Sequence, residues 1–148
     1  MAEAITLAKK AEALGEVPVG AVIEKDGRII GRGYNTTESG KDPTAHAEMA
    51  AIREAASELG GWRLLGCNMY VTCEPCAMCA GALVLARIKK LIIGAADPKS
   101  GACGSVFNII QESRLNHFIE IEAGVMGGEC ELMMKSFFKK RRKKDAEL

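Results

Sequence analysis

The sequence predicts an α/β fold with three layers, in which a five-stranded mixed sheet lies between helices on both faces. Strand-like and helix-like hydrophobic patterns alternate along most of the chain, as they do where crossover helices join parallel strands. One connection differs, because the turn at Asp26-Gly27 lies between two β-rich runs and is typical of an antiparallel hairpin. A sheet with both kinds of connection contains parallel and antiparallel pairs.

The first half of the chain contains four predicted elements. Apolar residues at helical spacing predict an amphipathic helix over residues 2–14. Two β-rich runs predict strands over 17–23 and 29–35, which form the hairpin. Thr44 is predicted to cap a helix over 45–59, whose end is marked by two consecutive glycines.

The second half is predicted to alternate between strands and helices. Pro75 is favoured in a first helical turn and predicts the start of a helix that runs to about residue 86. That helix is apolar nearly all round, so we expect it to be buried. The other predicted elements are strands over 68–72, 90–94 and 119–123, a short helix over 106–111 and a last helix from about residue 128. Because helix-joined strands are parallel, we expect ligands beyond their carboxyl ends, where the next helices begin.

Length and composition restrict the class of protein. The 148 residues are enough for one domain, and no repeat or linker divides them, so we expect a single domain over residues 1–148. Hydrophobic residues make up 48% and charged residues 26% of the chain, which excludes disordered and fibrous proteins. The formal net charge of +1 excludes a generally polycationic protein.

Positive charge is nevertheless concentrated near the C-terminus. Six of the 20 basic residues are consecutive, at 139–144, so the rest of the chain has 14 basic against 19 acidic residues. This asymmetry predicts a polyanionic partner for the basic C-terminal helix, residues 128–148. The alternative is a solvated helix end whose cations lie near the negative end of the helix dipole.

Nothing in the sequence predicts export or membrane insertion. The longest apolar stretches, 80–86 and 91–96, are too short to span a bilayer, and the N-terminus is typical of a charged amphipathic helix rather than a signal peptide. We therefore expect a cytoplasmic protein with no membrane partner. In that compartment the six cysteines are more often metal ligands or catalytic groups than disulfides.

Two predicted helix starts carry the candidate catalytic residues. Cys76 and Cys79 are three residues apart, so they share a helix face, and the helix N-terminus favours their thiolate forms. With His46 they make three ligands, which leaves a fourth position on a zinc ion open for water. Glu48 is the candidate for proton transfer. Because residues two apart on an ideal helix point about 200° from each other, convergence of His46 and Glu48 requires a metal that lies off the helix end.

Cys73 offers an alternative arrangement. It could join the three ligands in a closed four-ligand site, which would be structural. We favour the open site because Cys73 follows a predicted strand, and because Glu48 would have no role in a closed one. The remaining cysteines show no ligand spacing and are predicted to be small buried residues: Cys67, Cys103 and Cys130.

The combined spacing of these residues is more specific than any single part. An H-x-E motif followed by P-C-x-x-C is the signature of zinc-dependent nucleobase deaminases. The sequence resembles the bacterial tRNA-specific adenosine deaminase family, within the cytidine deaminase-like superfamily, over nearly its whole length. The stretches that carry the resemblance include residues 15–22, 42–48, 70–82 and 97–105. The resemblance implies a homodimer with one zinc ion per subunit. It also implies hydrolytic conversion of adenosine to inosine at the wobble position of a tRNA anticodon, with the anticodon stem-loop as partner.

The resemblance also implies roles for single residues. His46, Cys76 and Cys79 would hold zinc, and Glu48 would move protons between water, the base and the leaving ammonia. Backbone N–H groups near Ala47 and Cys76 would stabilise the developing oxygen charge. The other implied substrate contacts are Asn35 to the base, Val17 and Pro18 in the pocket wall, Asp97 near flipped-out nucleotides, and Phe137, Phe138, Arg141 and Arg142 against RNA.

Alternatives stay open at this stage. Asn35 could instead cap the end of its strand, and at least one of Phe137 and Phe138 is expected in the core. A deaminase of a free base such as guanine or cytosine would use the same zinc and glutamate but would need no basic helix. A zinc-binding module that binds RNA without catalysis is the third possibility.

Overall fold

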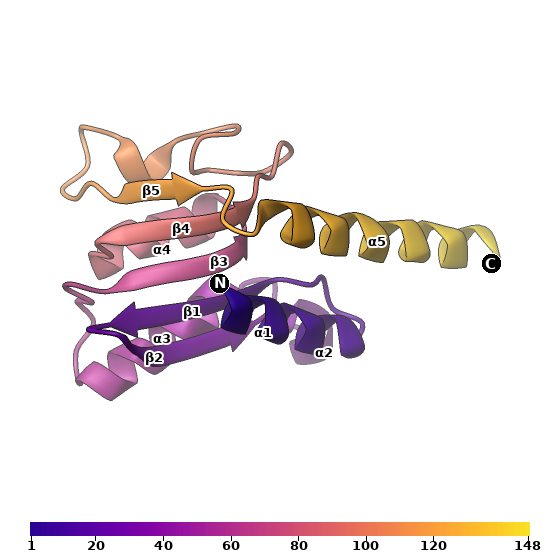
Figure 1. Cartoon of the computed structure of the whole chain (residues 1–148), viewed down its shortest axis with the longest axis horizontal. Helices are drawn as coiled ribbons and strands as arrows, with labels where there is room; N and C mark the ends of the chain where they lie inside the picture. Colours follow the sequence, from indigo (N-terminus) through magenta and orange to yellow (C-terminus); the bar gives the residue numbers. More distant parts are fainter.

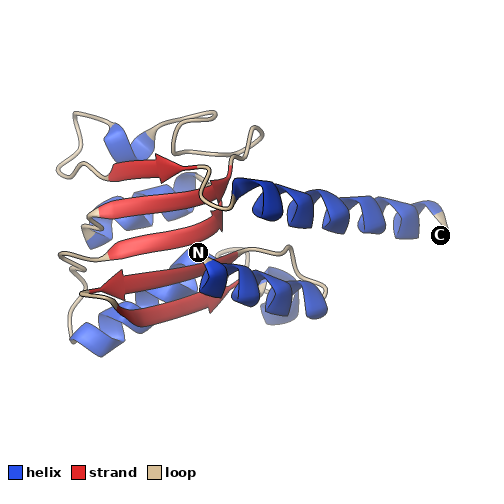
Figure 2. Cartoon of the chain, viewed as in Figure 1, coloured by secondary structure: helices blue, strands red, loops and turns tan.

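The computed structural model describes residues 1–148 and has the predicted α/β/α layers (Figures 1 and 2). The elements follow the predicted order with one short addition, α2. They are α1 (Ala2–Ala13), β1 (Gly20–Lys25), β2 (Arg28–Tyr34), α2 (Thr37–Gly40), α3 (Ala47–Leu59), β3 (Asn68–Cys73), α4 (Ala77–Ala86), β4 (Lys90–Ala95), η1 (Ile109–Gln111), β5 (Glu120–Ala123) and α5 (Gly127–Ala146). None of the helices combines the length and the apolar character that crossing a membrane requires.

The sheet is mixed, as predicted, with the strand order β2-β1-β3-β4-β5. β1 is antiparallel to both of its neighbours, β2 and β3, while β3, β4 and β5 are parallel to one another. β2 therefore points in the same direction as β3 and β4. The segments that follow these three strands consequently leave the sheet at the same edge, which is where ligands were expected.

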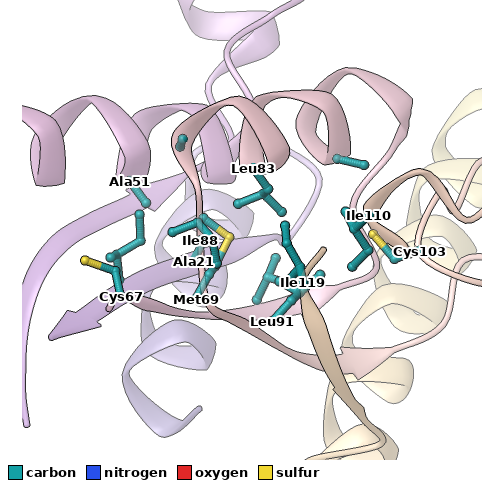
Figure 3. Close-up of a cluster of buried hydrophobic side chains, with 14 of the residues drawn as sticks. Ala21, Ala51, Cys67, Met69, Leu83, Ile88, Leu91, Cys103, Ile110 and Ile119 are labelled. Carbon is teal, nitrogen blue, oxygen red and sulfur yellow. The ribbon is translucent and has the colours of Figure 1, made fainter. Parts of the chain in front are cut away.

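Helices cover both faces of the sheet. Figure 1 shows α1 in front of the sheet and α3 and α4 behind it, while α5 starts at the right-hand ends of the strands and extends well past them. The main hydrophobic core lies under α3 and α4 and includes Ile23, Met69 and Leu91 from the strands. Figure 3 shows part of it, in which Leu83 from α4 points toward the sheet. A smaller buried cluster, formed by Ile5, Ala95 and Cys130, lies under α1 and α5.

Two glycines determine how closely α3 approaches β2. A Cβ atom on Gly31 would lie 2.3 Å from the carbonyl oxygen of Ala51, and one on Gly33 would lie 2.1 Å from that of Ala47. Both distances are too short for any side chain, so the helix backbone packs directly on the strand. The start of α3 is thereby held beside the end of β2.

The predicted boundaries were wrong at four places. α4 begins at Ala77 rather than at Pro75, because Cys76 keeps an extended backbone (φ −74°, ψ 177°) and is the N-cap of the helix. The first strand begins at Gly20 rather than residue 17, because the chain bends before it, with the N–H of Val19 donating to the carbonyl of Val17 at 2.8 Å. Thr44 does not cap α3: its N–H and hydroxyl both donate to Oδ1 of Asp42, and the helix begins two residues later than predicted. The helix predicted over 106–111 is only the 3₁₀ turn η1.

Candidate metal centre and substrate pocket

Three metal-ligand side chains meet where α3 and α4 begin. His46 is the N-cap of α3, Cys76 is the N-cap of α4, and Cys79 lies in the first turn of α4. Their donor atoms all lie within 4.8 Å of one another. Nδ1 of His46 is 3.5 Å from Sγ of Cys79 and 3.7 Å from Sγ of Cys76. The structure thus brings together the three residues that the spacing predicts as ligands.

The geometry of this group fits a zinc ion. With Zn–S and Zn–N bonds of about 2.3 and 2.0–2.1 Å, tetrahedral coordination separates a sulfur and a nitrogen ligand by about 3.5 Å. The two observed nitrogen–sulfur distances, 3.5 and 3.7 Å, agree with that value. One imidazole and two thiols are also a ligand set that favours zinc over magnesium or calcium. The residues present therefore suit a three-ligand zinc site.

Hydrogen bonds within the group distribute its protons unequally. Bonds with Cys79 and then His46 lower the pKa of Cys76 to about 4, so this sulfur is a thiolate at neutral pH. The bond with Cys76 also raises the pKa of His46, and it raises the pKa of Cys79, with burial adding to the latter effect. The raised pKa values favour the protonated forms of His46 and Cys79, so a metal ion competes with protons for these two ligands.

Glu48 lies beside the ligands, in the first turn of α3. Its side chain is only 3% exposed, and burial raises the pKa of the carboxyl group despite the opposing effects of a hydrogen bond with Cys79 and the charge of His46. His46 precedes the helix and has an extended backbone (φ −85°, ψ 152°). The angular spacing of an ideal helix therefore does not apply to this pair, and both residues reach one pocket.

Cys73 lies outside the group of three ligands. It is buried at the end of β3, and desolvation raises the pKa of its thiol to about 12, so the sulfur stays protonated. The closed four-ligand site, our alternative prediction, is therefore not formed. Cys67, Cys103 and Cys130 are buried, as predicted, and none of the six cysteines forms a disulfide.

A cavity of about 630 Å³ adjoins the metal centre, with His46, Glu48 and Cys76 in its wall. Several other predicted site residues line it, namely Val17, Asn35, Asp97, Phe138 and Arg142. Pro18 does not line the cavity, because its side chain is fully buried. Phe137 and Arg141 also lie outside the lining, and Arg141 is 3.7 Å from Glu38 instead. Neither phenylalanine belongs to the hydrophobic core, so that expectation was wrong.

Asn35 connects the end of β2 to the start of α3. Its Oδ1 accepts a hydrogen bond from the N–H of Ala47 at 2.8 Å, so Asn35 caps the helix that follows and not its own strand. This bond corrects the expectation for Ala47, since an N–H already paired with Asn35 is not a free donor for an oxygen charge. The amide NH₂ of Asn35 has no hydrogen-bond partner in the protein and belongs to a pocket-lining residue.

One face of α5 forms a pocket wall that the sequence reasoning found only in part. The lining residues from this helix recur at intervals of one to four, as one helical face requires: Glu131, Met134, Lys135, Phe138 and Arg142. The resemblance implied Phe138 and Arg142 as contacts, whereas Glu131, Met134 and Lys135 were not predicted. Glu74, also in the lining, was missed although it directly precedes the P-C-x-x-C motif, because its hydrogen-bond partners lie 23 to 31 residues further along the chain.

The ligand assignment predicts the zinc content of two variants. His46→Ala should fail to retain zinc through dialysis, because it leaves two protein ligands, whereas Cys73→Ser should keep one zinc per chain, as the wild type does. Metal analysis of the dialysed proteins measures both. Zinc should also leave the wild type as the pH falls, because protons return to His46 and Cys79. Loss of zinc from Cys73→Ser at neutral pH would support the four-ligand site instead.

Comparisons with known proteins agree with this geometry. The family described as the cytidine and deoxycytidylate deaminase zinc-binding region matches residues 1–95, which include all three ligands and Glu48. The tRNA-specific adenosine deaminase of Bacillus subtilis (strain 168) is 52% identical over 144 residues, which cover 97% of this chain and 89% of that protein.

Two solved structures extend the comparison. A tRNA:A34 deaminase, from a study of A-to-I editing at the wobble position of transfer RNA, is 43% identical with a TM-score of 0.87, over 90% of this chain and 96% of that one. A guanine deaminase from Bacillus subtilis is 34% identical with a TM-score of 0.63, over 96% of this chain and 90% of that one. The chain is thus more similar to the tRNA deaminase in both sequence and structure. It belongs to the tRNA-specific adenosine deaminase family, within the zinc-binding cytidine and deoxycytidylate deaminases.

Proposed function

We propose that this protein hydrolyses adenosine to inosine and ammonia at the wobble position of a tRNA anticodon. The observation that carries the proposal is the buried Glu48 beside a three-ligand metal group, in a pocket bordered by a basic helix. The names of the relatives at 52% and 43% identity support the same substrate. The guanine deaminase is the less similar neighbour, which makes a free base the second choice.

The residues of the site suit hydrolytic deamination. When bound by His46, Cys76 and Cys79, zinc supplies Lewis acidity, which makes water nucleophilic at neutral pH. Glu48 accepts a proton from the attacking water and delivers protons to the ring nitrogen and to the departing amine, which leaves as ammonia. Its raised pKa suits this exchange, because a group that both takes and gives protons works best with a pKa near the ambient pH.

The pocket and its surroundings suit an RNA loop. A volume of about 630 Å³ is in the range that encloses a ligand of several rings. Asn35 offers its unpaired amide NH₂ to a ring acceptor of the base. Bases of a single-stranded loop can turn out of the stack at low cost. α5 carries six consecutive basic residues at 139–144, one of which, Arg142, lines the pocket, and phosphates of the stem-loop would lie along them.

We further propose that residues 1–148 act as one domain within a cytoplasmic homodimer. The free thiols suit a reducing compartment, and tRNA is found there. Exposed apolar side chains gather in the segment that contains η1, where Phe107 and Leu115 border a hollow of about 240 Å³. Val106 and Phe118 of the same segment are also exposed. An apolar surface of this kind is typical of a protein–protein contact, and a second copy of this chain is the proposed partner.

Glu48→Gln tests the proposed chemistry. It should lower the rate of inosine formation about a thousandfold, because the amide cannot carry the protons, while zinc content stays unchanged. Nucleoside mass spectrometry measures conversion of an anticodon stem-loop with adenosine at the wobble position. Free guanine and cytosine serve as competing substrates. Full activity of the variant, or activity on a free base alone, would contradict the proposal.

A charge-neutralised variant tests the role of α5. Changing Lys139, Arg142 and Lys143 to Gln should raise KM for the stem-loop about tenfold and make its salt dependence shallower, by about 0.7–0.9 in log–log slope per lost phosphate contact. The control changes Lys25, Arg28 and Arg63, which lie at the opposite edge of the sheet, and should leave both quantities unchanged. Equal effects from the two triple variants would indicate attraction by total charge and not by α5.

Phe107→Glu tests the dimer. Placing a charge in the apolar surface should convert a dimer to a monomer, as measured by sedimentation of the protein at micromolar concentration. Trp62→Glu is the matched control, because Trp62 is 57% exposed, as Phe107 is, but belongs to a different surface loop. A wild-type protein that sediments as a monomer would contradict the proposed assembly.

A further inference from the structure

Glu74 is a buried carboxylate whose partners all come from one loop. It follows β3, lies two residues before Cys76, and is 6% exposed. No lysine, arginine or histidine pairs with it. The N–H of Asp97 donates to its Oε1 at 3.3 Å, and the N–H groups of Cys103 and Ser105 donate to its Oε2 at 3.1 Å each. The hydroxyl of Ser105 also donates to Oε1.

The loop of residues 97–105 is wrapped closely around this carboxylate. A Cβ atom on Gly101 would lie 2.2 Å from Oε2 of Glu74, so the backbone passes the carboxylate where no other residue fits. The N–H of Ala102 donates to the carbonyl of Pro75 at 2.9 Å. The N–H of Glu74 itself donates to the carbonyl of Ala95 at 2.9 Å, just before the loop begins. The loop is thus joined to the segment that carries Cys76 at several points.

The same loop forms one side of the substrate pocket. Asp97, Pro98, Lys99 and Ser100 line the cavity, as do Glu74 and the wall residues of α5. Asp97 orders this part through bonds from the N–H groups of Lys99 and Ser100 at 3.0 and 3.2 Å. A shift of the loop relative to the metal ligands would therefore change the space available to the base and its neighbours.

We propose that Glu74 is a positioning residue, which fixes the 97–105 loop to the metal-ligand segment and so sets the substrate-binding side of the pocket. Both of its carboxylate oxygens already accept hydrogen bonds from the loop, so it acts through the loop and not by touching the substrate. The part of the proposal that concerns substrate rests on the proposed function. The anchoring of the loop does not depend on it.

The variants Glu74→Gln and Ser105→Ala distinguish anchoring of the 97–105 loop from a role in catalysis or in metal binding. Gln has one acceptor oxygen in place of two, and its NH₂ group would face N–H donors of the loop, so the anchor should loosen without loss of volume. Ser105→Ala removes the hydroxyl bond from the loop side and leaves Glu74 and Cys76 unchanged. Ser113→Ala is the matched control, because Ser113 lies in the following, exposed part of the chain and makes no side-chain hydrogen bond.

Three measurements on the zinc-loaded proteins test the proposal. Hydrogen exchange in the peptide spanning 97–105 should be at least tenfold faster in Glu74→Gln and several-fold faster in Ser105→Ala. Both should keep one zinc per chain. KM for the stem-loop should rise about tenfold and several-fold, respectively, with kcat within a factor of two of the wild type. The double variant should resemble Glu74→Gln alone, because both changes release the same contact. Ser113→Ala should match the wild type.

Other results would overturn the proposal. Unchanged exchange in Glu74→Gln would mean that the carboxylate does not anchor the loop. A fall in kcat with KM and exchange unchanged would assign Glu74 to the reacting groups instead, and loss of zinc would assign it to the metal site. If the wild type converts no stem-loop, the proposed function fails, and the exchange rates alone decide whether Glu74 holds the loop.

Discussion

The backbone of α3 lies directly on β2, because Gly31 and Gly33 present no side chain to the helix. This contact places the first turn of α3 beside the end of the strand, where Asn35 can accept the N–H of Ala47. The same edge receives the end of β3 and the start of α4, because β1 is inserted antiparallel between β2 and β3 and leaves those two strands pointing the same way. Two helix N-termini therefore meet, and their ligands converge without any long-range ion pair.

The electrostatics of the metal group follow from that meeting. Cys76 lies at the start of α4, and hydrogen bonds with Cys79 and His46 stabilise its thiolate form. Glu48 is buried a short distance away in the same region, where desolvation has the opposite effect and favours its neutral form. The site thus combines a stabilised thiolate with a carboxyl group that readily accepts protons. The difference arises because neighbouring groups donate hydrogen bonds to the sulfur of Cys76, whereas burial dominates at Glu48.

Patterns in the sequence predicted the sheet, the hairpin and the three ligands, because periodicity and short spacings are local properties. They predicted the wrong helix start at Thr44, since Asp42 competes for its N–H and hydroxyl. The partners of Glu74 lie 23 to 31 residues further along the chain and are mainly backbone amides, so no residue pattern reveals them. The wall formed by α5 was only partly predictable from the sequence. The helical spacing of its residues is local, but only the packing of α5 beside the strand ends shows which face borders the pocket.

The positions of His46 and Cys76 have a consequence for how this chain can vary. Both residues occupy N-cap positions, yet neither side chain makes the hydrogen bond that Ser, Thr, Asp or Asn would make there, a bond that stabilises a helix by about 1 kcal/mol. α3 receives a substitute from Asn35, whereas the N-cap of α4 makes none. Selection for folding without metal would therefore favour Asp or Ser at position 76, at the expense of the site. At position 76, a residue that caps α4 better would stabilise the metal-free protein but would bind zinc less well than cysteine.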